Sequence, residues 1–254
     1  MRKILRTKKG YGNFGNLSKN YDRVRKGFPA ETIDYILKKI GKEKPYILDM
    51  GCGTGIATEE LREKGACVVG TDIDAKMIHQ AEANNRYQIK YYVAPAEKQP
   101  FEDKKFDAVT AFSAFHWFTN KKVLDEIKRV LKPKGFFFAV NKNEVGDFKK
   151  KNKKILHRFI KKKPPDVKKK YNPKKILGGN NFRPVEEKTF PITEYFNPAE
   201  AVDYVQTMSI WNLLPEKKKR EALEQLSKHF KRIMRNGRVE RQLDIVVISG
   251  NSST

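Results

Sequence analysis

The sequence predicts an α/β fold in which helices cover a doubly wound, mostly parallel sheet. Between residues 29 and 141, short apolar runs alternate with segments whose apolar residues recur at helical spacing. A glycine-rich loop at 51–55 follows the first apolar run, and Asp72 ends the second. Strands and helices that alternate in this way form right-handed parallel crossovers within one sheet. A later helical stretch predicts a helical cap inserted before the last strand.

The first half of the chain contains the alternation in its clearest form. Pro29 opens an amphipathic helix and Gly41 ends it. An apolar run at 46–49 then predicts a buried strand that leads into the glycine loop. The alternation continues with a helix at 54–64, a strand at 67–72, a helix around Met77 and Ala81, strands at 89–93 and 106–111, a helix at 123–131, a turn at 132–135 and a strand at 136–140.

The second half is less regular. Residues 142–175 are rich in Lys, and Pro164 and Pro165 exclude one continuous helix, so a cap or a mobile connection is expected. An edge strand is predicted at 182–196, because Pro191 cannot donate to a central ladder. Helices at about 198–210 and 215–234, a last strand at 243–248 and a polar tail at 250–254 complete the chain.

Positive charge is concentrated in two segments. Of a formal net charge of +24, residues 1–26 carry nine basic residues against one acidic residue, and residues 142–175 carry fifteen against three. Such a charge attracts nucleic acid, anionic lipid or an anionic substrate. Nucleic-acid sites favour Arg, but this chain has only 14 Arg among its 54 basic residues. Compositional drift therefore explains the excess of Lys at least as well as nucleic-acid binding does.

Cys52 and Cys67 are too few for a disulfide framework, and neither has metal-ligand spacing to a second Cys or a His. We therefore expect a reducing, cytoplasmic location and no metal site. No apolar run approaches the length of a membrane span, so neither export nor a membrane helix is expected.

The loop Asp49-Met50-Gly51-Cys52-Gly53-Thr54-Gly55 is placed to hold a cofactor. Glycines between a strand and a helix let the backbone approach a ligand, with helix N–H groups facing it. A tight turn alone needs fewer glycines. The dinucleotide pattern G-x-G-x-x-G would require a third glycine where Ile56 stands, so an NAD-dependent oxidoreductase is disfavoured.

Asp72 closes the second strand at the sheet edge where open α/β folds bind ligands. A carboxylate there accepts hydrogen bonds from both ribose hydroxyls. An isolated Asp after a strand is more often a helix cap, a role that Asp74 shares. Together with the glycine loop, Asp72 favours a nucleoside-containing cofactor.

Four segments in order resemble the motifs of class I S-adenosylmethionine-dependent methyltransferases. They are I-L-D-M-G-C-G-T-G at 47–55, V-V-G-T-D-I-D-A-K-M-I at 68–78, A-P-A-E-K-Q-P-F at 94–101 and V-L-K-P-K-G at 130–135. The resemblance implies a Rossmann-like fold and S-adenosyl-L-methionine as cofactor. It covers about residues 29–141.

The resemblance also implies residue roles. The loop glycines would lie beside the methionine part of the cofactor, and Asp72 would bind the cofactor's ribose. Many relatives have Asp where Pro95 stands, so a contact to the adenine amino group must come from backbone or from Glu97. The implied cofactor-binding residues are Tyr21, Asp49, Gly51, Cys52, Gly53, Gly55, Asp72, Ile73, Met77, Ala96, Glu97 and Ser113.

The segment S-A-F-H-W-F at 113–118 resembles a subgroup of small-molecule enzymes similar to trans-aconitate methyltransferase. Tyr21, Arg25, Phe28 and Pro29 resemble that subgroup's N-terminal Y-x-x-x-R-P-x-Y-P segment, with Lys26 in place of the usual proline. In the subgroup this segment lies over the cofactor. The implied substrate residues are Arg25, Phe115, His116 and Trp117.

His116 is the one catalytic candidate, since its ordinary pKa suits proton acceptance from an oxygen or nitrogen nucleophile. Its alternative role is to shape a wall of the substrate site. Methyl transfer from a sulfonium is an in-line displacement, and a carboxylate or neutral amine acceptor needs no base. Both roles stay open, and His79, His157 and His229 receive no function.

These features predict a methyltransferase that acts on a small-molecule acceptor. An anionic acceptor is one possibility. Two alternatives stay open: methylation of RNA or another macromolecule through the basic segments, and non-catalytic binding of S-adenosylmethionine. No oligomeric state is predicted. The expected parts are 1–28, a basic segment over the cofactor site; 29–141, the cofactor-binding core; 142–236, a Lys-rich substrate cap with the edge strand; and 237–254, the last strand and tail.

Overall fold

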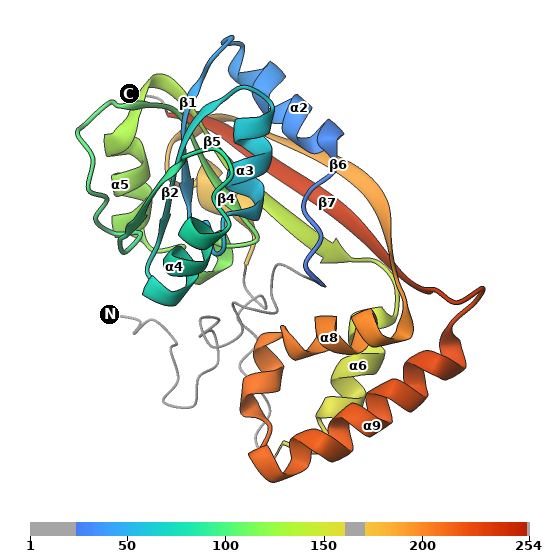
Figure 1. Ribbon diagram of the computed structural model, residues 1–254. Coiled ribbons are helices and arrows are strands. Elements are labelled where there is room, and N and C mark those ends of the chain that lie inside the picture. The colour runs from blue at the N-terminus through green and yellow to red at the C-terminus, as the bar shows by residue number, and fades with distance from the viewer. Residues whose placement is uncertain (1–23, 161–170, 253–254) are drawn as a thin grey trace. The chain divides into compact units, whose positions relative to one another are not determined.

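A computed structural model describes residues 24–160 and 171–252 of the chain. The fold is built on one seven-stranded sheet with the order β3-β2-β1-β4-β5-β7-β6 (Figure 1). The strands are β1 Tyr46–Met50, β2 Cys67–Asp72, β3 Lys90–Val93, β4 Phe106–Phe112, β5 Leu131–Glu144, β6 Phe182–Phe196 and β7 Val239–Ser252. The helices are α2 Ala30–Ile40, α3 Ile56–Glu63, α4 Ala75–Ala83, α5 Lys121–Val130, α6 Phe148–Leu156, α7 Pro173–Gly178, α8 Pro198–Gln206 and α9 Glu216–Ile233, with short 3₁₀ helices η2 Phe115–Trp117 and η3 Ser209–Leu213.

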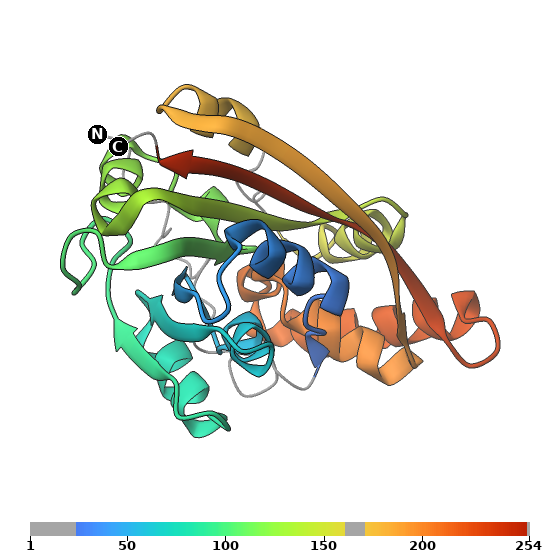
Figure 2. The same ribbon diagram turned by 90° about the horizontal axis from the view of Figure 1, so that it is seen from above.

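The sheet is doubly wound and mostly parallel, which confirms the predicted fold class. β1 pairs in parallel with β2 on one side and with β4 on the other, and β2–β3 and β4–β5 are parallel as well. Figure 2 shows the arrow of β7 pointing against that of β5. The direction of winding reverses between β1 and β4, so the carboxyl ends of these strands form the topological switch point at which such sheets bind ligands.

The described residues cluster into two compact units. Of the described residues, unit 2 comprises 27–142, 171–190 and 245–252, and unit 1 comprises 24–26, 143–160 and 191–244. The boundary falls within the strands β5, β6 and β7. Each unit has a hydrophobic core of its own. The four functional parts expected from the sequence stay a prediction.

The core of unit 2 lies between the sheet and its helices. β4 is buried along its whole length, and α5 turns Val123, Leu124, Ile127 and Val130 toward it. Asn120 caps α5 by accepting the Val123 N–H. The core of unit 1 is formed by α6, α8, η3 and α9, where Phe148, Tyr204 and Phe230 form an aromatic cluster.

Two predicted strands are too short. β5 begins at Leu131 and includes the expected turn at 132–135, and it continues to Glu144. β7 spans Val239–Ser252 and so includes part of the expected polar tail. A strand that lies between two neighbours continues as long as they offer hydrogen bonds, even where its side chains are polar. The predicted edge position of β6 is confirmed by the sheet order.

The Lys-rich stretch forms α6 and α7 on either side of 161–170, and those intervening residues lie outside the described part of the chain. α8 is shorter than expected and ends at Gln206, after which η3 begins at Ser209. Asn197 and Glu200 form a capping box that fixes the start of α8.

Candidate active site

The glycine loop has the left-handed backbone that its sequence requires. Gly51, Gly53 and Gly55 have φ angles of 74°, 58° and 86°, which residues with a side chain rarely adopt. The N–H groups of Gly51 and Cys52 donate to the Thr71 carbonyl at 2.7 and 2.9 Å, and so fasten the loop to β2. A Cβ atom at Gly53 would meet nothing within 4 Å, so the backbone is open to a ligand there.

The same loop contacts the segment after β4. A Cβ atom at Gly51 would lie 2.8 Å from Ala114 Cβ and 3.0 Å from the Phe118 ring. Only glycine permits this approach. Two motifs that are separated by more than sixty residues in the sequence therefore meet at the carboxyl ends of β1 and β4.

Tyr91 supports the loop from below. Its hydroxyl would lie 2.5 Å from a Cβ at Gly55, and its ring lies against Gly70. Burial raises the pKa of Tyr91 far above its usual value, so the hydroxyl stays protonated. The sequence reasoning missed Tyr91, because a tyrosine within an apolar strand carries no signal for a loop contact.

Asp49 lies beneath the loop and is fully buried. Its carboxylate accepts hydrogen bonds from the hydroxyls of Thr58 at 2.6 Å and Thr110 at 3.0 Å. Burial raises the pKa of Asp49 to about 6, although the two hydroxyls lower it. In this arrangement Asp49 joins β1, α3 and β4 to one another and has no surface exposed to a ligand.

Asp72 organises the ligand-facing edge. One carboxylate oxygen accepts the Gly53 N–H at 3.0 Å, and the other accepts the Asp74 N–H at 2.9 Å. Asp74, rather than Asp72, caps α4 by accepting the Lys76 N–H. The helix-cap role that was the alternative for Asp72 is therefore carried by Asp74.

An apolar edge lies next to Asp72. Ile73 is 43% exposed and Val93 is 56% exposed, and Val93 is paired in register with Asp72. Exposed branched side chains beside a carboxylate suit a flat purine that is joined to a ribose. Of the other residues predicted near the adenine, Ala96 is partly buried against the core and Glu97 accepts a hydrogen bond from Asn120 at 3.0 Å.

Met77 differs from the prediction. It is only 4% exposed and packs on the inner face of α4 with Ile78 and Ala81. The helical period turns this position toward the core, so Met77 supports the adenine edge from behind. Cys52 points beneath the loop, with its Sγ 3.0 Å from a Cβ at Gly70, and burial raises the pKa of its thiol.

The segment 113–118 holds the catalytic candidate. Ser113 is exposed, has a left-handed φ of 52° and donates its N–H to the Val140 carbonyl at 2.7 Å. Phe115 is fully buried, 4.9 Å from the Phe137 ring, so the predicted substrate contact is a core residue instead. His116 and Trp117 are half-buried, with ring centroids 5.0 Å apart.

Tyr171 completes this aromatic group. Its ring centroid lies 5.8 Å from that of His116 and 6.1 Å from that of Phe115, and its hydroxyl donates to Asn141 at 3.2 Å. Burial raises the pKa of Tyr171 to about 12. Nothing local in the Lys-rich sequence around Tyr171 indicates this position, because the contact joins segments far apart in the chain.

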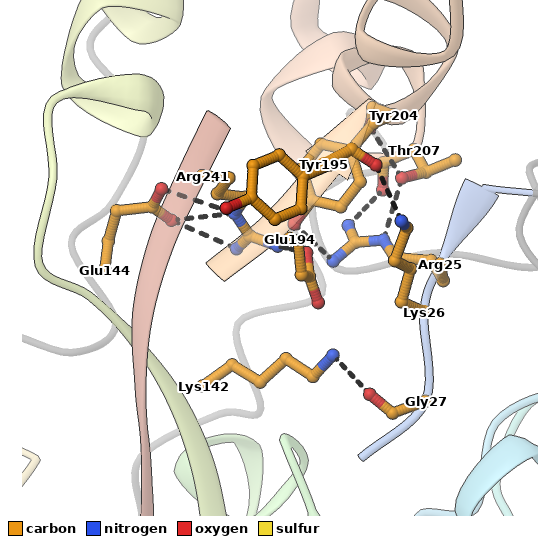
Figure 3. Close-up of polar contacts among 10 residues, drawn as sticks. All are labelled: Arg25, Lys26, Gly27, Lys142, Glu144, Glu194, Tyr195, Tyr204, Thr207 and Arg241. Atoms are coloured by element: carbon orange, nitrogen blue, oxygen red, sulfur yellow. Dashed lines mark hydrogen bonds and ion pairs between the residues drawn. The ribbon is translucent and has the colours of Figure 1, made fainter. Parts of the chain in front are cut away.

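Residues after the N-terminal segment are held by the core of unit 2. Both carboxylate oxygens of Glu60 lie 3.0 Å from the Phe28 N–H, and Lys142 donates to the Gly27 carbonyl at 2.7 Å (Figure 3). A Cβ at Gly27 would overlap the Glu60 carboxylate. Burial raises the pKa of Glu60 to about 7, while the Phe28 N–H and Lys142 lower it.

Arg25 belongs to unit 1. Its guanidinium donates to the Tyr204 hydroxyl at 2.9 Å, to the Thr207 hydroxyl at 2.9 Å and to the Thr207 carbonyl at 3.1 Å (Figure 3). It also lies 4.4 Å from the centre of the Tyr204 ring. These contacts fix Arg25 on the end of α8, whereas the predicted substrate contact stays a prediction. Tyr21 lies outside the described residues.

A buried ionic group lies beside Arg25 in unit 1. Arg241 binds Glu144 through two nitrogens at 3.0 and 3.1 Å and Glu194 at 2.8 Å, and its guanidinium lies 4.5 Å from the Tyr204 ring centre (Figure 3). Arg241 is 5% exposed and Glu194 is 4% exposed. The Tyr204 ring thus has two guanidinium groups against it, and the group ties β5, β6 and β7 to α8.

The loop, Asp72 and the segment after β4 lie at the carboxyl ends of β1, β2 and β4, an arrangement that suits a nucleoside cofactor without a pyrophosphate. Residues 48–139 match the family described as a methyltransferase domain. The chain carries a class I, S-adenosylmethionine-dependent methyltransferase domain, as its motifs predicted. The open backbone at Gly53 and the apolar edge at Ile73 fit this cofactor.

An uncharacterized methyltransferase of Mycobacterium tuberculosis is 33% identical over 123 residues, which are 48% of this chain and 49% of that protein. Malonyl-[acyl-carrier protein] O-methyltransferase of Pseudescherichia vulneris is 31% identical over 124 residues, 48% and 49% of the two chains. The chain therefore spans about half the length of these curated relatives.

A solved structure from Anabaena variabilis, of a candidate methyltransferase from an antibiotic biosynthesis pathway, has a TM-score of 0.66 at 18% identity and covers 87% of this chain and 96% of its own. This likeness establishes the fold over nearly the whole chain. Within the described ranges, none of the helices combines the length and the apolar character that a membrane crossing requires.

Proposed function

We propose that this protein transfers a methyl group from S-adenosyl-L-methionine to a small-molecule acceptor in the cytoplasm. The observation that carries the proposal is the close contact of Gly51 with Ala114 and Phe118. This contact brings the cofactor loop to the segment that holds His116 and Trp117. Small-molecule chemistry needs an enclosed aromatic site of this kind more than it needs an extended polar surface.

The chain's residues divide the work of binding. In this proposal Asp72 accepts hydrogen bonds from the ribose hydroxyls, the loop glycines contact the methionine part and Ile73 covers the adenine. The open backbone at Gly53 and the exposure of Ile73 support these roles. When bound, the cofactor supplies a methyl group that its sulfonium already activates. The protein then has to position the acceptor in line and exclude water.

We infer that His116 accepts a proton from an acceptor that needs deprotonation. Tyr171 stays protonated at neutral pH because its pKa is about 12, so it orients rather than accepts. Its ring contacts with His116 and Phe115 hold the imidazole in place. An acceptor that is already a carboxylate would leave His116 the role of a wall residue.

One relative supports a small acceptor. Malonyl-[acyl-carrier protein] O-methyltransferase methylates an oxygen of a small acyl group that a carrier protein presents. Because the match covers about half of each chain, it supports the kind of acceptor and leaves its identity open. The positive balance of 142–175 favours an anionic one.

The proposal is tested with methyl-labelled S-adenosylmethionine and a cell extract divided into a small-molecule filtrate, an RNA fraction and a protein fraction. We expect label in the filtrate. Label in RNA, or on the amino-acid residues of proteins, would replace the small-molecule acceptor by a macromolecule, whereas label on an acyl group that a carrier protein presents would keep the acceptor small. Binding without label in any fraction would favour the non-catalytic alternative.

A His116→Ala variant tests the role of the imidazole in the same assay. If His116 is the base, turnover falls by about 10²- to 10⁴-fold while cofactor affinity is unchanged. Trp117→Phe serves as the matched control, because it changes the neighbouring ring and keeps the imidazole. Wild-type turnover in His116→Ala at every pH would make His116 a wall residue.

A further inference from the structure

Two helices of unit 1 carry several basic residues that form no ion pair within the described part of the chain. α6 has the sequence FKKKNKKIL, without a carboxylate. The second half of α9, after Glu224, is likewise free of acidic residues. The two helices are neighbours, since Phe148 of α6 stacks on Phe230 of α9 at 5.5 Å.

The first half of α9 is different. Three of its four cations are paired within the helix: Lys218 with Glu221 at 2.7 Å, Lys219 with Glu216 at 2.7 Å and Arg220 with Glu224 at 3.4 Å. In the second half, the described residues offer no ion pair to Lys228, Lys231 or Arg232. The same holds, within the described chain, for Lys150, Lys153 and Lys154 of α6. We call these six residues, together with Lys151, the basic face of unit 1.

The residues of the basic face are exposed, whereas the apolar sides of both helices are turned inward. Phe148 and Leu156 of α6 and Leu226 and Phe230 of α9 are buried in the core of unit 1. The helices therefore have no apolar side left to insert into a partner. What they present is a field of positive charge.

The two helices bring their charges together at His229. Burial lowers the pKa of His229, and the positive charges of Arg232 and of Lys151 from α6 lower it further. Lys151 forms one exposed ion pair, with Asp147 at 3.2 Å. Lys151 of α6 and Arg232 of α9 therefore lie on the same side of the pair of helices, close enough to His229 to act on it.

We propose that the basic face of unit 1 docks the protein on an anionic lipid surface. Clusters of four to eight basic residues on an amphipathic helix are the sequence pattern that binds such surfaces. Six of the seven residues are lysines, whose compact charges suit a diffuse field and lack the planar fork that reads phosphates in pairs. The attachment is electrostatic and reversible.

Nucleic acid is the competing partner, and the described residues favour it less. Recognition of single-stranded RNA depends on exposed aromatic rings that stack on bases. The aromatic residues of α6 and α9, Phe148 and Phe230, are both buried. An anionic lipid surface is therefore a better partner for the basic face than single-stranded RNA.

The test is sedimentation of the full chain with vesicles of phosphatidylcholine alone and of phosphatidylcholine mixed with phosphatidylglycerol. We expect binding to the mixed vesicles only, and release at about 0.5 M salt, where the screening length falls to a few Å. Each lysine near such a surface changes partitioning about fivefold, so Lys150→Gln, Lys153→Gln and Lys154→Gln together should weaken binding about 100-fold.

The matched control removes the same charge from elsewhere on the same pair of helices. Lys218→Gln, Lys219→Gln and Arg220→Gln change three cations that are already paired, so we expect less than about a fivefold effect. Glutamine is a good helix former, and circular dichroism with thermal unfolding checks that both variants fold as the wild type does.

Three results would overturn the proposal. One is equal weakening by the two triple variants, which would reduce the effect to net charge. Another is failure of the wild type to bind the mixed vesicles. The third is binding of tRNA at the same salt that is tighter than vesicle binding and is lost in the Lys150, Lys153 and Lys154 variant, which would assign the basic face to nucleic acid.

Discussion

Asp49 and Asp72 show how two carboxylates 23 residues apart in sequence take different roles through their surroundings. Asp49 is fully buried and accepts only from two threonine hydroxyls, so it stabilises the base of the loop. Asp72 is half-buried and holds the Gly53 and Asp74 N–H groups at the ligand edge. Burial, rather than residue type, separates the structural carboxylate from the binding one.

Asp49→Asn should change how stability depends on pH. The folded-state pKa of Asp49 is raised from 3.8 to about 6, so the folded protein binds this proton more tightly than the unfolded chain. The stabilisation from the bound proton is present below about pH 4 and is lost as the pH rises through 6. Relative to Asp49→Asn, the wild type should therefore lose up to about 3 kcal/mol between pH 4 and 7.

Urea unfolding of both proteins across that range measures the difference. The pKa of Glu60 is also raised, but Glu60 titrates in both proteins, so its contribution to the pH dependence of stability cancels when the two are compared. Parallel stability curves for wild type and variant would show that Asp49 has an ordinary pKa, which would contradict its placement beneath the loop.

At the scale of single elements, β7 is stabilised by a side chain as well as by its ladder. Arg241 binds Glu144 of β5 and Glu194 of β6, and all three groups are buried or nearly so. Replacing one partner of a buried ionic group leaves the others without compensation, which costs about 3 to 5 kcal/mol. Arg241→Met should destabilise unit 1 by this amount.

The control is Arg238→Met, three residues before Arg241 and directly before β7, where the guanidinium is exposed and lies 5.8 Å from the centre of the Tyr195 ring. It should cost less than about 1 kcal/mol. The chain has two tryptophans, Trp117 in unit 2 and Trp211 in unit 1, so Trp211 fluorescence in a Trp117→Phe background follows unit 1. Equal midpoints in urea for the two variants would remove Arg241 from its stabilising role.

The elements also show what the sequence predicts and where it stops. Apolar runs at 46–49 and 106–111 predicted β1 and β4, because buried parallel strands are continuous apolar segments. The lengths of β5 and β7 were underestimated, since partners in the sheet, not their own side chains, extend them. The glycine loop and Asp72 were predictable because their signals are local.

Other site contacts carry no local signal. Arg25 meets Tyr204 across 179 residues, and Tyr171 reaches His116 from a Lys-rich stretch. Phe115 and Met77 have the residue types of a binding site and the burial of a core, which only packing decides. Motifs thus predict a cofactor loop better than they predict the aromatic side chains around it.

For the whole molecule, the central claim is that the loop and Asp72 bind S-adenosylmethionine. It is tested most directly by thermal unfolding of the wild type, Asp72→Ala and Asp74→Ala with S-adenosylhomocysteine or NADH. At 100-fold over Kd, S-adenosylhomocysteine should stabilise the wild type by about 2.7 kcal/mol. NADH should have no effect.

The two variants localise the binding. Asp72→Ala should weaken binding by about 1.5 to 3 kcal/mol, the range for a lost hydrogen bond to a charged group. Asp74→Ala removes the side chain that caps α4 and keeps the backbone N–H that Asp72 accepts, so it should lower stability by about 1 kcal/mol and keep the affinity. Stabilisation by S-adenosylhomocysteine that Asp72→Ala alone diminishes is the predicted result, and stabilisation by NADH alone would contradict the account of the site.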